Sequence, residues 1–195
     1  IVYYYLDENK NPHSLKVIRD EFAVQYKLRK EQMQREIKRL QKSNVENNRV
    51  LFRKLRSLQQ DYAFLDFRLK EVIESPLFMI KDVVYIFDHT NDSCFVYDEN
   101  LQLNRSFYID YHHKKGWKKE LIADQEQGAV YAQFEKGGLC YLKKIDLTTG
   151  KITDSYKLEK HIFPSNIKIR NNTAYYLYKD IFNHGQISLY QQQLY

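Results

Sequence analysis

The chain has 195 residues, of which 17 are tyrosine and 11 are phenylalanine, while glycine and proline number only six and three. This length allows one sizeable domain or one domain that carries an insertion, and the many aromatic residues favour β-strands. Nowhere do about 18 consecutive apolar residues occur, which excludes a membrane-spanning helix. The net charge of +6 comes from one element, because residues 27–56 hold eleven Lys or Arg against three Glu.

Residues 1–20 contain two apolar and aromatic runs on either side of the polar stretch DENKNP. This pattern predicts two antiparallel strands joined by a turn. We expect them to be the middle strands of an incomplete sheet that begins before Ile1. Any targeting segment is likewise expected upstream of Ile1.

After residue 20 the hydrophobic period changes from 2 to about 3.5, so residues 21–74 are predicted to be a helical insertion. The polar cluster SNVENN separates two apolar runs, and Ser43 or Asn44 is expected to cap the second helix. Pro76 then ends the insertion. We expect an antiparallel hairpin in which each helix buries one apolar stripe. The stripes consist of Phe22, Tyr26, Met33, Ile37 and Leu40, and of Leu51, Leu55, Leu58, Tyr62, Leu65, Leu69 and Val72.

Three interpretations of this hairpin stay open. In the first, the stripes pack on each other and on the flank of the β domain, and the basic residues form a solvated face. The regular heptads of the second run favour, as another interpretation, a homodimer or a docking contact through the helices. Nucleic-acid binding is not favoured, because no recognition fold accompanies the basic face and no aromatic residues alternate with the charges.

A recurring phrase organises residues 75–195. Val84, Val130 and Ala174 stand in register at spacings of 46 and 44 residues, and each is followed by tyrosine. Such a period is close to the about 40 to 50 residues of a four-stranded propeller blade, and we predict a partial β-propeller of about three and a half antiparallel blades. A small, open antiparallel β domain is the alternative. The three blades are expected at about 75–115, 116–160 and 161–195, after the incomplete blade of 1–20.

Turn residues divide each blade into strands. The first is expected to contain Leu77–Ile80, Val83–Asp88, Cys94–Asp98 and Arg105–Ile109; the second Glu120–Ala123, Ala129–Phe134, Leu139–Asp146 and Ile152–Leu158; the third Asn166–Arg170, Thr173–Lys179 and Gln186–Leu194. The third blade has no fourth strand. In propellers, a strand from the other end of the chain often pairs with such an edge.

The phrases PLFMIKDVVYIFDHTNDSCFVYDENLQLNRSF and LIADQEQGAVYAQFEKGGLCYLKKIDLTTGKI resemble the later blades of uncharacterised six-bladed β-propeller lipoproteins of Bacteroides-type bacteria. The resemblance covers most of 75–195 and extends less clearly over 1–73. It implies export to the periplasm or cell surface and a binding or scaffolding role. Its motifs are structural, so it supplies no catalytic residue.

The histidines all lie in or beside connections between predicted strands. His13, His89 and His184 follow the second strand of a blade, and His112, His113 and His161 lie between blades. Both kinds of connection meet on one face of a propeller, and the loop DYHHKKGW is their densest part. The predicted ligand-binding residues are His89, Asp110, His112, His113, Trp117, His161 and His184.

Signatures of catalysis are absent from the sequence. No HxH or HExxH spacing indicates a metal site, and we expect neither a metal ion nor another cofactor. Cys94 and Cys140 occupy equivalent positions one blade apart and are expected to be buried thiols without a disulfide. Carboxylates such as Asp88 and Asp92 lie in predicted turns, without the spacing of a catalytic pair. Glycine-rich phosphate loops and the GxSxG motif are missing.

The leading prediction is therefore a non-enzymatic module that binds a protein or a carbohydrate through its histidine-rich loops. The alternative is a hydrolase or lyase whose acid, base or metal ligands converge on the same loops from several blades. A third hypothesis makes the helical hairpin the working part, as a dimerisation or docking arm.

Overall fold

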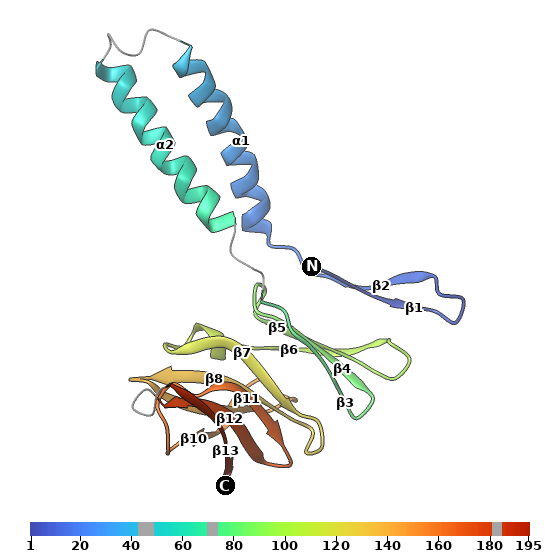
Figure 1. Ribbon diagram of the computed structural model, residues 1–195. Coiled ribbons are helices and arrows are strands. Elements are labelled where there is room, and N and C mark those ends of the chain that lie inside the picture. The colour runs from blue at the N-terminus through green and yellow to red at the C-terminus, as the bar shows by residue number, and fades with distance from the viewer. Residues whose placement is uncertain (43–48, 70–73, 181–184) are drawn as a thin grey trace. The chain divides into compact units, whose positions relative to one another are not determined.

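The computed structural model describes residues 1–42, 49–69, 74–180 and 185–195 (Figure 1). Within these ranges the protein is mainly β-structure, with two helices and four antiparallel sheets, which confirms the predicted mixture of strands and helices. The chain divides into two compact units, Ile1–Ile73 and Glu74–Tyr195. None of the described helices is long and apolar enough to cross a membrane.

The first unit begins with a two-stranded sheet of β1 (Val2–Leu6) and β2 (Pro12–Val17). Asp7 holds their turn, because its carboxylate accepts hydrogen bonds from the backbone N–H of Asn11 at 2.8 Å and from Nε2 of His13 at 3.1 Å. These bonds, the one to Asn11 first, lower the pKa of Asp7 to about 2. The ring of His13 also stacks on Tyr5. His13 therefore belongs to the first unit and makes its contacts there.

Helices α1 (Glu21–Gln41) and α2 (Arg49–Leu69) form the predicted antiparallel hairpin (Figure 1). The carboxylate of Asp20 caps α1 by accepting from the backbone N–H of Ala23 at 2.9 Å. Met33 and Leu65 are buried between the helices, and the rest of the described stripe is partly buried: Tyr26, Ile37, Leu40, Leu51, Leu55, Leu58 and Tyr62. Ser43, Asn44 and Val72, and the side chains of Phe22 and Leu69, lie outside the described residues.

The second unit contains three sheets, each built from strands that pair in chain order (Figure 1). The first has β3 (Leu77–Ile80), β4 (Val83–Asp88), β5 (Ser93–Tyr97) and β6 (Leu103–Tyr108). The second has β7 (Trp117–Asp124), β8 (Ala129–Lys136), β9 (Leu139–Ile145) and β10 (Ile152–Lys157). The third has β11 (Ser165–Arg170), β12 (Thr173–Asp180) and β13 (Gln186–Gln193).

Strand boundaries agree with the sequence predictions to within two residues, with one exception. Strand β7 begins at Trp117 and not at Glu120, so the prediction that Trp117 lies in a loop is wrong. The cause is a break in the β7–β8 register between Trp117 and Leu121, where Lys119 has a φ of 59°. A bulge of this kind interrupts the alternation from which strands are predicted.

Two-residue turns close several hairpins. At Lys81-Asp82 and again at Asn171-Asn172 both residues have positive φ, as a type I′ turn requires. Asparagine tolerates this conformation better than most residues do. Gly150 has a different reason to be glycine, because a Cβ there would lie 2.1 Å from the carbonyl oxygen of Tyr108.

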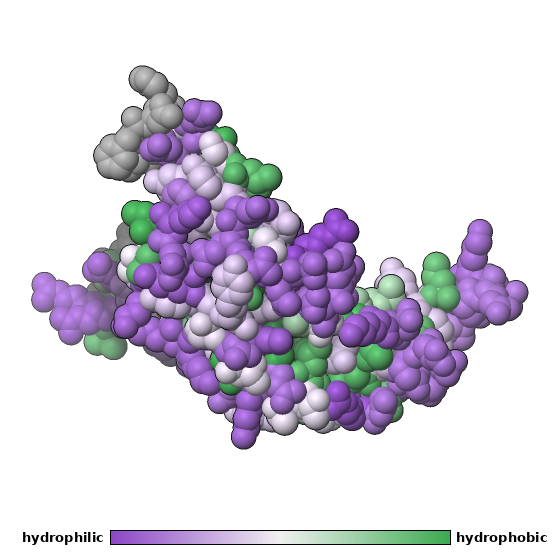
Figure 2. Space-filling model, turned by 90° about the horizontal axis from the view of Figure 1, so that it is seen from below, coloured by the Kyte–Doolittle hydropathy of each residue, from purple (hydrophilic) through white to green (hydrophobic). Residues whose placement is uncertain are grey.

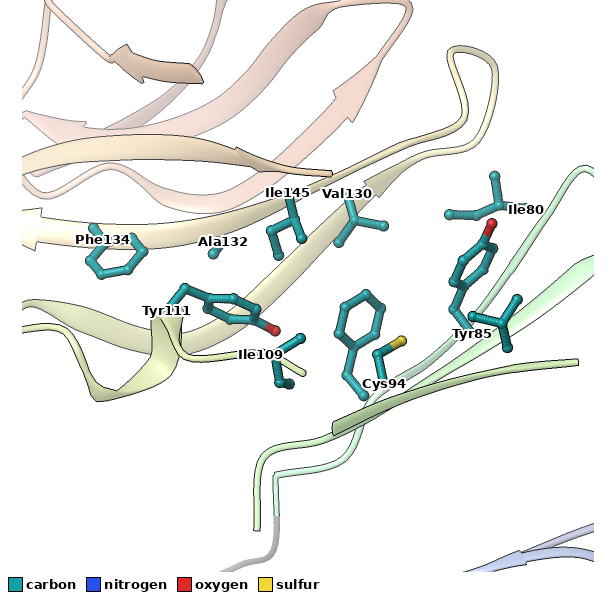
Figure 3. Packing of buried hydrophobic residues seen from close by; sticks show 11 residues of the cluster. Ile80, Tyr85, Cys94, Ile109, Tyr111, Val130, Ala132, Phe134 and Ile145 are labelled. Atoms are coloured by element: carbon teal, nitrogen blue, oxygen red, sulfur yellow. The ribbon is translucent and has the colours of Figure 1, made fainter. Parts of the chain in front are cut away.

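Each pair of successive sheets shares an apolar core. The first core joins Phe87, Cys94 and neighbours in β3–β5 to Val130, Ala132 and Phe134 in β8. In Figure 3, Tyr111 and Ile109 lie between these two groups. The second core joins the other side of the middle sheet to β11–β13. The three sheets of the second unit are thus held together by face-to-face packing.

A buried carboxylate ties the last two sheets together. Asp124 is fully buried at the end of β7. It accepts hydrogen bonds from the backbone N–H groups of Asn171 at 3.1 Å and Asn172 at 2.7 Å, both in the turn before β12, and from Gln127 N–H at 3.3 Å.

Polar groups cover most of the exterior seen in Figure 2, with smaller apolar patches between them.

Candidate functional site

The site begins at the connection between β4 and β5, where the chain reads DHTND. Asp88 is 1% exposed, and its carboxylate accepts hydrogen bonds from the backbone N–H groups of Thr90 and Asn91, both at 3.1 Å. Asp92 follows with a φ of 51°, and its carbonyl oxygen accepts from Ile109 N–H at 2.9 Å. The turn is thus fixed at both ends, and the side chains of His89 and Asp92 project from a rigid support.

His89 has a defined tautomer. Its Nδ1 lies 2.7 Å from the carbonyl oxygen of Glu74, which only accepts, so Nδ1 must carry the proton and donate. Its Nε2 is then an acceptor, and the hydroxyl of Tyr111 donates to it at 2.8 Å. Burial lowers the pKa of His89 to about 4, although the bond to Glu74 opposes this change. His89 is therefore neutral near pH 7.

The second part of the site is the 3₁₀ helix η2 (Tyr111–His113), which follows β6. Tyr111 is fully buried in the first core and anchors this turn. His112 and His113 both direct Nε2 at the same carboxylate oxygen, Oδ1 of Asp92, at 2.9 and 2.8 Å. Because a carboxylate oxygen accepts, each ring donates an Nε2–H. Two imidazoles from η2 therefore meet one carboxylate from the β4–β5 turn.

Exposure differs strongly among these three side chains. That of His112 is 5% exposed, that of Asp92 35% and that of His113 59%. Burial and the neighbouring His113 lower the pKa of His112. With its proton on Nε2, His112 has a bare Nδ1, which is buried and lacks a hydrogen-bond partner among the described residues. The group thus runs from a buried ring to an open edge.

Trp117 completes a cluster of rings. Its ring centroid lies 4.7 Å from that of His89, 5.6 Å from that of His112 and 6.2 Å from that of Tyr111. Gly116 sets its position, because a Cβ on Gly116 would lie 2.5 Å from the carbonyl oxygen of Glu135. We call His89, Asp92, Tyr111, His112, His113 and Trp117 the histidine cluster.

The remaining predicted site residues do not belong to the histidine cluster. Asp110 is about half exposed and pairs with Lys114 at 3.4 Å, at the edge of the histidine cluster. Nδ1 of His161 forms a hydrogen bond with the hydroxyl of Tyr176 at 3.1 Å, and the ring of His161 stacks on Tyr178, with the ring centroids 4.2 Å apart. It thus forms a separate aromatic group in the third sheet. His184 lies outside the described residues.

A basic groove continues from the η2 connection. It has a volume of about 270 Å³ and is lined by Lys115, Phe134, Glu135, Lys136, Tyr141, Lys143 and Ser155. The ammonium of Lys143 lies 4.1 Å from the centroid of the Phe134 ring, a cation–π contact. The ring of Phe134 is itself buried, so the groove combines positive charge with the partly exposed ring of Tyr141.

Neither cysteine is suited to nucleophilic chemistry. Cys94 and Cys140 are both buried free thiols. Burial raises the pKa of Cys94, and it raises that of Cys140 to about 12. These thiols stay protonated near pH 7.

Two members of the histidine cluster did not stand out in the sequence. The sequence gives no functional signal for Tyr111, and it predicts Asp92 only as a turn residue. Asp92 sits at a position of positive φ, where Asp is enriched for backbone reasons alone, so its type carries no functional signal. The one available signal was the register of the two loops, because Ser93 pairs with Tyr108 and this brings the β4–β5 turn beside the residues after β6.

No protein-family model matches the sequence, and no curated protein is significantly similar to it. The site is therefore interpreted from its own geometry and chemistry.

Proposed function

We propose that this protein is a non-enzymatic binding module, and that its three sheets in the second unit are blades of a β-propeller. The strand order within each sheet, the face-to-face packing of successive sheets and the contact between β7 and β11 support the blade arrangement. In a propeller these two strands are the innermost ones of neighbouring blades. The sequence resemblance to exported six-bladed propeller lipoproteins supports a place in the bacterial envelope.

The observation that carries the binding role is the histidine cluster. His89, His112 and Trp117 bring three rings together beside the partly exposed carboxylate of Asp92. Loops held on a rigid sheet scaffold are the common place for binding residues. Nothing in the packing of the sheets requires two adjacent histidines to meet one carboxylate at the surface.

The basic groove indicates the class of ligand. Lys115, Lys136 and Lys143 supply positive charge, and the partly buried ring of Tyr141 supplies aromatic surface. Sugars stack on aromatic rings, and carboxylates pair with ammonium groups. We therefore propose an acidic carbohydrate as the ligand, with a protein partner as the other outcome of the test.

A binding titration of the full chain tests this proposal. The probes are an oligomer of galacturonic acid and a neutral oligomer of glucose, followed by calorimetry and by the fluorescence of Trp117. We expect saturable binding of the acidic oligomer, at least about fivefold weaker in Lys115→Gln and weaker in high salt, because both changes reduce attraction between exposed charges. The matched control Lys151→Gln alters an exposed lysine outside the groove and leaves binding unchanged. Absence of binding, or equal loss in both variants, contradicts the proposal.

One observation favours a second candidate, a hydrolase or lyase. Asp92, His112 and His113 place three potential metal-ligating or acid–base groups within 4.8 Å of one another. Under this alternative, incubation with the acidic oligomer releases new reducing ends, and His113→Ala abolishes the release. Intact oligomer after long incubation, with binding retained, leaves the binding role.

Exposed apolar residues favour a third candidate, a docking or dimerisation role for the hairpin. Val24 and Leu28 of α1 and Phe64 and Phe67 of α2 are each more than half exposed. Val50 and Phe52 of α2 are exposed to a similar extent. Single apolar residues are common on surfaces, but six on one hairpin form more exposed apolar surface than isolated residues do. Light scattering on the full chain tests this candidate. If the wild type has the mass of a monomer and Phe64→Ser has the same mass, a homodimer through the hairpin is excluded.

A further inference from the structure

The side chains of Asp92, His112 and His113 offer a set of metal ligands that sequence spacing did not reveal. Each contributes one ligand atom, and the three atoms all lie within 4.8 Å of one another. Two imidazoles and one carboxylate are a donor set that suits zinc and related divalent transition metals, whereas magnesium and calcium prefer sites made of oxygen atoms alone. We propose that these three residues bind a divalent transition-metal ion of the zinc type.

The distances fit this proposal after a small adjustment. The Nε2 atoms of His112 and His113 lie 2.9 and 2.8 Å from Oδ1 of Asp92. Ligands about 2.0–2.1 Å from a tetrahedral ion are about 3.3 Å apart. The rings need to move from the carboxylate by about half an ångström. Each neutral ring then carries its proton on Nδ1, and the freed lone pair of Nε2 binds the ion in place of the hydrogen bond to Asp92.

Both halves of the site are held in place without the ion. On one side, the turn that carries Asp92 is fixed by the buried Asp88 carboxylate and by the hydrogen bond from Ile109 N–H to the Asp92 carbonyl. On the other, η2 is anchored by the fully buried Tyr111. A metal site on such supports loses little conformational entropy when it binds.

The three side chains are already directed at one point, because Nε2 of His112 and Nε2 of His113 both face Oδ1 of Asp92. His113 is 59% exposed, so the fourth coordination position faces water or a ligand. Three protein ligands with one open position are typical of reactive or ligand-binding zinc sites.

The inference deepens the proposed function, because His112 and His113 belong to the histidine cluster that is proposed to bind the ligand. It rests on that function only in one respect, namely that a carbohydrate oxygen occupies the open coordination position. Metal binding itself is tested alone. The full chain is stripped with EDTA, dialysed and titrated with Zn²⁺ in competition with a chromophoric chelator, and Co²⁺ is used to record the visible spectrum.

We expect one Zn²⁺ per chain and a Co²⁺ spectrum of four-coordinate type. Asp92→Asn keeps a residue that tolerates positive φ but removes the charged ligand, and His113→Ala removes an exposed ring. We expect each to weaken Zn²⁺ binding at least about tenfold. Asp154→Asn and His161→Asn are matched controls outside the ligand set and leave the affinity unchanged. Equal affinity in all variants, or no stoichiometric binding at micromolar Zn²⁺, overturns the proposal.

The acidic-oligomer titration is repeated in EDTA and in Zn²⁺ to separate the two proposals. Oligomer binding without stoichiometric Zn²⁺ binding refutes the metal site and leaves the carbohydrate-binding role. Stoichiometric Zn²⁺ binding that both ligand variants weaken, without oligomer binding, establishes the metal site and refutes the acidic-carbohydrate ligand.

Discussion

Replacing Tyr111 with phenylalanine removes one hydroxyl from the histidine cluster and little else. That hydroxyl donates to Nε2 of His89 at 2.8 Å, and Tyr111 is fully buried. The variant keeps the ring and its packing but leaves the His89 acceptor without its partner. An unsatisfied buried polar group costs about 1–3 kcal/mol, so we expect Tyr111→Phe to lower the free energy of unfolding of the second unit by this amount.

Urea unfolding followed by fluorescence measures this cost. Trp117 is the single tryptophan of the chain, and its ring lies 4.7 Å from that of His89, so the signal reports on the second unit at this site. The partner variant is His89→Asn, whose amide nitrogen is able to keep the bond to the Glu74 carbonyl.

A double-mutant cycle then isolates the bond between the two side chains. Because Tyr111 and His89 contact each other directly, we expect a coupling energy of about 0.5–3 kcal/mol. The reasoning is refuted if the two substitutions add to within about 0.3 kcal/mol, or if Tyr111→Phe alone is as stable as the wild type.

Other predictions follow from burial and backbone geometry. The pKa of His89 is about 4 in the folded protein and 6.5 ordinarily, so the unfolded chain binds this proton more tightly, and the free energy of unfolding falls by up to about 3 kcal/mol between pH 6.5 and pH 4. In EDTA-containing buffer, we expect the His89→Asn variant to lack this pH-dependent loss of stability. The same dependence of the free energy of unfolding on pH in the variant and the wild type contradicts this. Asp124→Ala leaves three backbone N–H groups without their acceptor and lowers the free energy of unfolding by about 3 kcal/mol; a loss below about 0.5 kcal/mol in urea contradicts this. Gly150→Ala brings a Cβ within 2.1 Å of a carbonyl oxygen, whereas Gly137→Ala, also at a positive φ, meets no atom within 4 Å. We expect Gly137→Ala to lower the free energy of unfolding by about 1 kcal/mol and Gly150→Ala to lower it clearly more; equal thermal midpoints of the two variants contradict this. Leu65→Ala empties one of the two positions that are buried among the described side chains of the helical hairpin. It lowers the stability of the hairpin by about 2–5 kcal/mol, measured by far-ultraviolet circular dichroism; unchanged helix melting contradicts it.

The regular parts of the fold were predictable because their signals are local. Alternating apolar residues and two-residue turns such as Asn171-Asn172 determine where strands begin and end, and the heptad pattern marks both helices. Strand β7 shows the limit of this reasoning. Its bulge at Lys119 interrupts the alternation, so Trp117 was assigned to a loop.

The candidate site was only partly predictable because it depends on pairing between distant residues. His89, His112, His113 and Trp117 were selected as loop residues, and the structure brings all four together. Asp92 is some 20 residues from both histidines in sequence, and only the β5–β6 register places it beside them. Metal-ligand motifs are recognised from short fixed spacings, so a set assembled across a hairpin and a 3₁₀ turn leaves no such signature.

The central claim is that the histidine cluster is where this protein binds its ligand. The most direct test is the nitrogen-15 NMR spectrum of the histidine side chains during titration with the galacturonic-acid oligomer. The account predicts saturable shifts of the His112 and His113 resonances, while those of His13 and His161 stay in place. Shifts confined to His13 or His161, or no shift at any histidine at saturating oligomer, contradict it.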